Sequence, residues 1–208
     1  PFIIVAQLLT AWQTIVSRNV NAQDSAVVSV GSINGGNSWN VIPESVIIKG
    51  NVRTLSPDMR VLVKERFLTL TNNIVEAFGA KVAIDYRDCS ASCVNDAEQT
   101  TFACDVADSI FGENRVLRTM APDMGSEDFA YMLQERPGCY LIIGAAPVLA
   151  GEDPLKGKSI QEVDDQTHFI YKNACLLHQP DYDFNDEIIP LGATLFVRLA
   201  ERYLSVDK

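Results

Sequence analysis

The order of secondary-structure patterns in the first part of the chain is the feature that most restricts its fold. Two strand patterns, 26–33 and 45–53, lie between helical patterns over 5–16 and 57–78, and a third alternating pattern follows at 81–87. The first helical pattern places its apolar residues on one face: Val5, Leu8, Leu9, Trp12, Ile15 and Val16. Helix, strand, strand, helix, strand is the order of a ferredoxin-like βαββαβ unit without its first strand. Because that strand lies inside the sheet, its loss would leave an interior gap.

The pattern changes after Asp96 and predicts a second, mixed α/β domain. We expect helices at 97–111 and 126–133, strands at 115–120 and 139–144, and a long terminal helix from Asn185 with two acidic residues in its first turn. The predicted domains are therefore 1–92 and 93–208. The irregular stretch from Ala145 to Tyr182 is long for a connection inside a domain, and such connections are usually functional or mobile.

Composition and charge exclude several classes of partner. The 208 residues are 47% hydrophobic and carry a formal net charge of −10, which is the range of a globular protein. Nucleic acid and an anionic membrane surface would both repel such a chain, so neither is an expected partner. The opening stretch FIIVAQLLTAW is too short to cross a bilayer, and it lacks the basic region and cleavage site of a signal peptide.

The cysteines and the first residue indicate the redox environment of the protein and whether the sequence is part of a longer one. Five cysteines are an odd number, which excludes a complete disulfide framework and favours a reduced, cytoplasmic protein. The chain opens on Pro1 directly at the start of a helical pattern and without an initiator methionine. We therefore expect the sequence to be an excerpt of a longer protein.

The stretch SINGGNSWNVIP, residues 32–43, is the first candidate for a binding site. It is too polar and glycine-rich for a core strand, yet it joins two strands that a two-residue turn could have connected. Arg53 follows on the second strand and points away from the apolar face that holds Val46 and Val52. An asparagine amide and a guanidinium suit a carboxylate held by two hydrogen bonds. The alternative is a wide hairpin loop beside a solvated arginine.

Two further stretches contain side chains that suit a binding site. MGSEDFAYM, residues 124–132, places a flexible glycine and a capping serine before a short helix, where backbone N–H groups can meet a polar ligand. An ordinary capped helix explains the same pattern. LLHQPDYDFNDE contains His178 ahead of an acidic loop, which suits a metal-bound imidazole, although a lone histidine is more often structural. His168 has no supporting pattern and is interpreted as a surface histidine.

The order of these stretches resembles the M20 family of metal-dependent peptidases and amidohydrolases, in particular the members that cleave N-acyl amino acids. The residues that carry the resemblance are QTIVSRNV (13–20), GGNSWNVIPESV (35–46), GNVRTLSP (50–57), MGSEDFAYM (124–132), PGCYLIIG (137–144) and HQPDYDFNDEIIPLGA (178–193). Together they extend over nearly all of the chain.

The resemblance implies a fold and a role for each candidate residue. It implies a ferredoxin-like lid, through which the enzyme forms a homodimer, followed by the C-terminal part of a catalytic α/β domain. Asn40 and Arg53 match lid residues that contact the substrate and its carboxylate. Gly125 and Ser126 match the lining of the substrate pocket, and His178 matches the last ligand of a site for two divalent metals, zinc or manganese. The implied reaction is hydrolysis of the amide bond of an N-acyl amino acid.

The family's other functional residues have no match in this sequence. Its earlier metal ligands, its general base and its oxyanion-stabilising lid histidine all precede the region that the chain resembles, and the segment 145–177 is longer than the usual connection. The resemblance therefore implies that the chain corresponds to the C-terminal half of such an enzyme and is inactive alone. The alternative is a small-molecule-binding or dimerisation module without catalysis.

Overall fold

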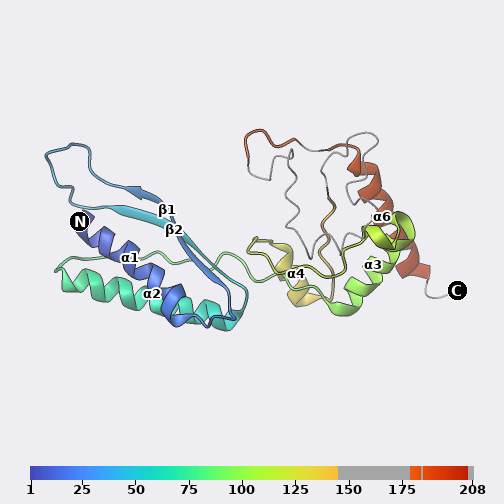
Figure 1. Ribbon diagram of the computed structural model, residues 1–208, viewed down its shortest axis with the longest axis horizontal. Helices are drawn as coiled ribbons and strands as arrows, with labels where there is room; N and C mark the ends of the chain where they lie inside the picture. The colour runs from blue at the N-terminus through green and yellow to red at the C-terminus, as the bar shows by residue number, and fades with distance from the viewer. Residues whose placement is uncertain (145–178, 184, 206–208) are drawn as a thin grey trace. The chain divides into compact units, whose positions relative to one another are not determined.

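The computed structural model describes residues 1–144, 179–183 and 185–205, and the chain divides into two compact units (Figure 1). Unit 1 contains Pro1–Ser92 together with Pro122–Asp128, and unit 2 contains Cys93–Ala121 and Phe129–Lys208. Among the described residues, no helix is both long enough and apolar enough to cross a membrane. The division in the chain falls between Ser92 and Cys93, with one short later segment that belongs to unit 1.

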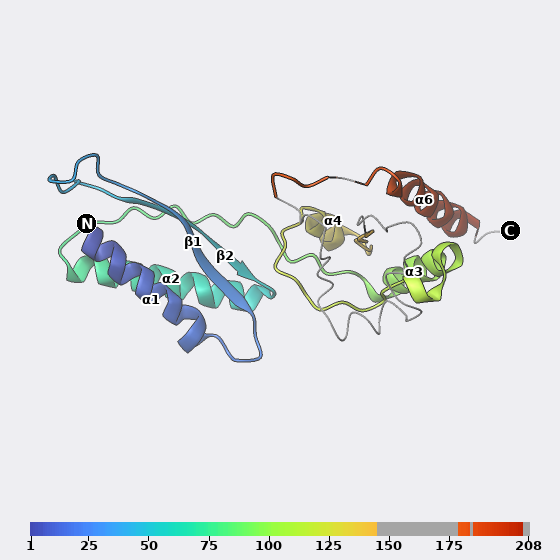
Figure 2. The same cartoon turned by 45° about the horizontal axis from the view of Figure 1, so that its top comes forward.

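Unit 1 consists of two helices packed against a β-hairpin. Its elements are α1 (Phe2–Asn19), β1 (Ala26–Asn34), β2 (Ile47–Thr54) and α2 (Pro57–Ala77). The helices lie side by side on one face of the hairpin, with α1 against β1 and α2 against β2 (Figures 1 and 2). The buried residues of this core are Leu8, Trp12, Ile15, Met59, Val63 and Val75.

Both helices follow from local signals in the sequence. The predicted apolar face of α1 is the buried one, since Val5, Leu8, Trp12 and Ile15 are its buried residues. In α2, Ser56 is the N-cap, and its hydroxyl accepts a hydrogen bond from the backbone N–H of Met59. Pro57 fills the first helical position, where the missing N–H costs nothing.

The hairpin is antiparallel and contains one β-bulge. Val28 pairs with Val52 and Val30 with Gly50, but the next pair is Ser32 with Lys49, so Gly31 is an extra residue in β1. At Gly50 the strands approach so closely that a Cβ atom would lie 2.4 Å from the carbonyl oxygen of Ser29. Glycine is therefore required at position 50.

The predicted strand at 81–87 does not form a ladder among the described residues. The only sheet there has the two strands β1 and β2, while residues 80–92 are extended without strand pairing. Alternation is nevertheless present, since Ile84 and Tyr86 are half-buried and their neighbours are exposed. The prediction of a strand was wrong for the hydrogen bonding, and the expected half-buried face holds for Ile84 and Tyr86 but not for Val82, which is 41% exposed.

Unit 2 has helices around a smaller core. The described elements are α3 (Ala97–Phe111), the 3₁₀-helix η1 (Glu113–Arg115), α4 (Phe129–Glu135) and α6 (Ile188–Leu204). α3 packs against α6, and their core contains the buried residues Val106, Ala107 and Leu195. Asp96 caps α3, and Gly112 ends it with a φ of 89°, a conformation that glycine adopts without strain.

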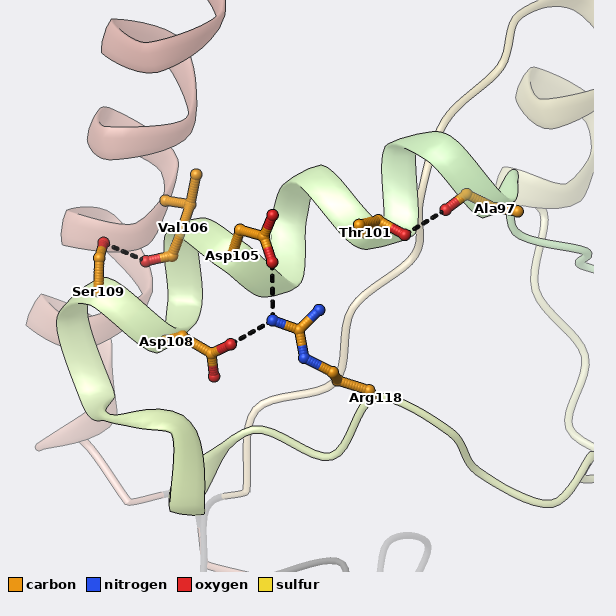
Figure 3. A network of polar contacts seen from close by, with 7 residues as sticks. All are labelled: Ala97, Thr101, Asp105, Val106, Asp108, Ser109 and Arg118. Atoms are coloured by element: carbon orange, nitrogen blue, oxygen red, sulfur yellow. Dashed lines mark hydrogen bonds and ion pairs between the residues drawn. The ribbon is translucent and has the colours of Figure 1, made fainter.

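An ion-pair network fastens the segment after η1 to α3. The guanidinium of Arg118 lies 2.7 Å from Asp105 and also pairs with Asp108, one turn further along the helix (Figure 3). These two carboxylates raise the pKa of Arg118 through hydrogen bonds and charge, so its guanidinium stays protonated in the native state. Side-chain contacts thus hold this segment without a β-ladder.

Several predicted boundaries in unit 2 differ from the structure. Residues 116–120 and 139–144 are not strands, and the side chain of Ile142 is 69% exposed where a buried strand was expected. Helix α4 starts at Phe129 and not at Ser126. α6 starts at Ile188, so Asp186 lies ahead of its first turn. Neither segment belongs to a ladder among the described residues; the backbone of Tyr140 instead exchanges hydrogen bonds with the side-chain amide of Asn95, over 2.8 and 3.0 Å.

Candidate functional site

Arg53 lies near the end of β2 on the face of the hairpin that points away from the helices. Its neighbours in the alternation, Lys49 and Asn51, are also exposed, whereas Val52 packs against the core. The Nε atom of Arg53 donates a hydrogen bond to Oδ1 of Asn51 over 3.2 Å. The strand therefore fixes the direction of this guanidinium, as the sequence predicted.

The same guanidinium reaches the segment 122–128, which belongs to unit 1. Nη1 of Arg53 donates a hydrogen bond to the carbonyl oxygen of Met124. Gly125 and Ser126 follow directly, and the hydroxyl of Ser126 lies 3.4 Å from that of Ser90. The structure thus brings together three of the five predicted site residues: Arg53, Gly125 and Ser126.

The conformation of this segment depends on a tight turn at Asp123. Oδ1 of Asp123 accepts a hydrogen bond from the backbone N–H of Gly125 over 2.5 Å. A Cβ atom at position 125 would lie 2.8 Å from the same oxygen, so a larger residue there would displace the carboxylate. The glycine allows the backbone to pass close beside Asp123, and this places Ser126 next to Ser90.

The cluster offers hydrogen-bond donors to an anion. Arg53 has five N–H donors, of which the structure uses two, and the described residues provide no acceptor for the backbone N–H of Ser126. Acidic side chains at positions 123, 127 and 128 flank these donors. An anion would therefore be held by direct hydrogen bonds to the guanidinium and not by a positive field over the surface.

Asn40 lies at the other end of the hairpin. It belongs to the loop 35–46, which joins Asn34 to its partner Ile47, and its amide oxygen accepts a hydrogen bond from Ser38 over 2.7 Å. Arg53 lies six residues beyond Ile47, the residue where the loop ends and β2 begins, and six residues of strand extend about 20 Å at 3.3 Å per residue. The structure does not bring Asn40 and Arg53 together within one chain.

The predicted metal ligand lies outside the described residues. His178 is not among them, and neither is His168 or the segment 145–177. In the part of the chain that is described, no three His, Cys, Asp or Glu side chains are grouped closely enough to hold a metal ion. These residues do not fit a metal centre by themselves.

Two contacts of the cluster were not foreseen from the sequence. The carbonyl of Met124 accepts from Arg53, and the hydroxyl of Ser90 lies beside Ser126. A backbone carbonyl has no signature in the sequence, because every residue carries one. The contact of Ser90 was equally unpredictable, because 36 residues separate it from Ser126.

Comparisons with known proteins extend over most of the chain. It is 42% identical to an N-acetyl-L-cysteine deacetylase of Bacillus subtilis over 84% of its length, and 30% identical to a hippurate hydrolase of Campylobacter jejuni over 98%. The matches span 41% and 46% of those proteins, so the chain covers less than half of each relative.

Comparison with solved structures shows a similar fold over almost all of this chain. The YxeP protein of Bacillus subtilis, a dinuclear metal binding peptidase, superimposes with a TM-score of 0.67 at 23% identity, over 99% of this chain and 46% of that one. Residues 13–156, more than half of the sequence, match peptidase family M20/M25/M40. The chain therefore belongs to peptidase family M20/M25/M40.

Proposed function

We propose that this chain is the C-terminal portion of a metal-dependent amidohydrolase that cleaves the amide bond of N-acyl amino acids. The relatives named for deacetylation of N-acetyl-L-cysteine and for hydrolysis of hippurate support this class of substrate. In this assignment unit 1 is the ferredoxin-like lid, and unit 2 is part of the catalytic domain. The observation that carries the proposal is the meeting of Arg53 with the segment that contains Gly125 and Ser126.

The proposed role of this cluster is to bind the carboxylate of the substrate's amino-acid half. A guanidinium binds a carboxylate through two parallel hydrogen bonds, and its contact with Met124 fixes one side of its plane. The hydroxyl of Ser126 provides a further donor beside it. Such contacts orient the amide bond toward the catalytic groups, which reduces the entropic cost of the reaction.

Two divalent metals, zinc or manganese, are part of the proposal. When bound, such ions activate water and polarise the amide carbonyl. The name of the YxeP protein and the family membership support a metal-dependent reaction. His178 is the proposed ligand from this chain. Because the described residues contain no ligand cluster, the remaining ligands would come from the part of the enzyme that the chain does not cover.

The distance between Asn40 and Arg53 supports a homodimer formed through the lid. A small substrate at Arg53 does not extend about 20 Å along the hairpin to Asn40 of the same chain. If both residues contact substrate, the loop 35–46 has to act on a substrate held by another subunit. The loop offers large exposed apolar side chains for such a contact, since Trp39 is 97% exposed. We propose a cytoplasmic location on the cysteine content.

The proposal is tested by replacing Arg53 in the full-length enzyme and comparing two matched substrates. Arg53→Ala should lower kcat/KM for an N-acyl amino acid roughly ten- to a hundredfold. This corresponds to a loss of about 1.5–3 kcal/mol in transition-state binding, the scale of a hydrogen bond to a charged group. The corresponding N-acyl amino-acid amide, which has no free carboxylate, should change little. Lys49→Ala, on the same face of β2, is the matched control and should leave both substrates unaffected.

Arg53→Ala also removes the contact with Met124, so a structural effect has to be distinguished from lost recognition. A loosened segment 122–128 would slow both substrates equally, and this result would contradict the carboxylate assignment. Arg53→Lys keeps the charge but not the planar pair of donors, and it should recover only part of the loss.

A further inference from the structure

The sequence contains one asparagine that is followed directly by glycine, and this pair, Asn34–Gly35, lies at the end of β1. An asparagine amide is lost most readily before glycine, because the next backbone nitrogen attacks it and glycine has no Cβ atom to hinder that approach. The reaction also requires an exposed amide, a free backbone nitrogen and a peptide plane that can rotate. All three conditions are met at Asn34.

The amide and the attacking nitrogen are both open to water. Asn34 and Gly35 are exposed. The described residues provide no acceptor for the backbone N–H of Gly35, which lies just outside the strand. An N–H that is open to water can lose its proton to hydroxide, and the resulting anion is the nucleophile of the reaction.

Rotation of the peptide plane disturbs one pair of the ladder. Asn34 is the last residue of β1, and its partner Ile47 is the first residue of β2, so no pair lies beyond them. The attack needs a backbone angle at Asn34 that differs from that of a strand, and this terminal pair therefore has to open. Opening at the end of an element costs far less than opening in its middle.

Packing at the base of the loop requires the glycine. A Cβ atom at position 35 would lie 2.7 Å from Cγ2 of Val46 and 3.2 Å from the carbonyl oxygen of Ser45. Any larger residue would push the two ends of the loop 35–46 apart. The fold thus keeps a glycine next to Asn34, and the reactivity of the pair follows from this packing.

Ser32 lies beside the group that leaves. Nδ2 of Asn34 donates a hydrogen bond to Oγ of Ser32 over 2.6 Å. When the carbonyl carbon Cγ is attacked, Nδ2 loses its conjugation with the carbonyl group and becomes a basic amine. The hydroxyl of Ser32 can then donate its own proton to this nitrogen, and water restores the proton on Oγ.

We propose that Asn34–Gly35 is a site of spontaneous deamidation in the native protein, assisted by the hydroxyl of Ser32. The backbone nitrogen of Gly35 forms a bond to Cγ of Asn34, Nδ2 leaves as ammonia, and a five-membered succinimide ring results. Water then opens the ring. Its addition at Cγ gives aspartate, and its addition at the backbone carbonyl carbon gives isoaspartate. The net change consumes one water molecule and releases one ammonia.

Both products place a new carboxylate at the base of the loop 35–46. In the register Lys49 pairs with Ser32, so Asn34 is its diagonal neighbour on the same face, at about 7–8 Å. The aspartate therefore gains an attractive charge. Isoaspartate also adds one methylene group to the main chain, so it displaces the loop that carries Asn40 relative to β2.

Peptide mass spectrometry of the full-length enzyme, after incubation at mildly alkaline pH, tests the site. The peptide that contains Asn34 should gain about 1 Da, and its isoaspartate should accept a methyl group from S-adenosylmethionine when an isoaspartyl methyltransferase is added. Asn37 and Asn40 lie in the same loop but precede serine and valine, so they should react at least about tenfold more slowly. No gain at Asn34, or an equal gain at all three positions, would overturn the proposal.

Ser32→Ala separates the contribution of the fold from that of the dipeptide. The variant should slow deamidation of Asn34 several-fold in the native enzyme. In urea it should react at the same rate as the unchanged chain, because the hydroxyl is no longer held beside Nδ2. Ser29→Ala, the same substitution earlier in β1, is the matched control and should leave both rates unaffected. A native rate that Ser32→Ala leaves unchanged or increases would contradict the assistance by the hydroxyl.

Discussion

Thr71 makes the polar contact that joins α1 to α2 inside the core of unit 1. Its hydroxyl accepts a hydrogen bond from Nε1 of Trp12 over 2.9 Å and donates one to the carbonyl oxygen of Phe67 over 2.6 Å. Thr71 is 2% exposed, so water cannot replace either partner. The ring of Trp12 also stacks on that of Phe67, with centroids 4.9 Å apart. One hydroxyl therefore satisfies the only polar atom of a buried tryptophan side chain.

Thr71→Val should lower the free energy of unfolding by about 1–3 kcal/mol, because it leaves the indole N–H buried without an acceptor. Urea denaturation followed by tryptophan fluorescence measures the change. Thr71→Ser keeps the hydroxyl and should retain most of the stability. Thr69→Val, at an exposed position of the same helix, is the matched control, and an equal loss there would show that the hydrogen bond contributes nothing.

At the scale of elements, helices were predictable and strands were less so. Helical hydrogen bonds are local, so apolar spacing, the cap at Ser56 and Gly112 were enough to locate α1, α2 and α3. Alternation at 81–87 correctly indicated that Ile84 and Tyr86 are half-buried but wrongly included Val82. Pairing depends on a distant strand that the segment itself does not encode. In the candidate site, too, the local feature was predictable and the long-range contact was not. The direction of Arg53 was predictable from its strand, whereas its contact with Met124 was not.

The segment 81–92 should have its own pH dependence through Tyr86. Burial raises the pKa of this phenol above its ordinary value of 10.0, and the charge of Asp88 raises it further. The neutral phenol is thus favoured in the folded state, so its contribution to stability is complete below pH 10 and is lost as the pH rises through the higher native pKa. Tyr86→Phe should remove this loss. The ultraviolet absorbance of tyrosinate, compared between the two proteins, measures the pKa, and identical titration curves would contradict the shift.

At the scale of the whole chain, two separate cores define the units. Val63 is fully buried in unit 1, and Val106 is 1% exposed in unit 2. The predicted boundary after residue 92 rested on a change of pattern along the chain. The return of Pro122–Asp128 to unit 1 was not predictable, because it depends on contacts with Arg53 and Ser90 that are distant in sequence.

Val63→Ala and Val106→Ala should therefore destabilise different parts of the chain. Each substitution leaves a cavity and should cost about 2 kcal/mol in its own unit. Native-state hydrogen exchange resolves the two, because Val63→Ala should accelerate exchange of core amides in unit 1 alone and Val106→Ala in unit 2 alone. Val61→Ala, at a position 56% exposed on α2, is the control. Equal acceleration in both units by either core variant would show that they unfold as one.

The bulge at Gly31 determines which changes in the length of β1 the hairpin tolerates. Before it, Val28 and Val30 face the helices, and after it Ile33 pairs with the inward-facing Ile48, so the extra residue resets the alternation by one step. Deleting Gly31 would therefore remove the bulge but leave Ser32 paired with Lys49 and Ile33 with Ile48, so the loop 35–46 would keep its direction. A hairpin that lacks the bulge can thus be one residue shorter in β1 and still present that loop in the same direction, whereas a deletion of any paired residue would have to be absorbed by loss of the bulge.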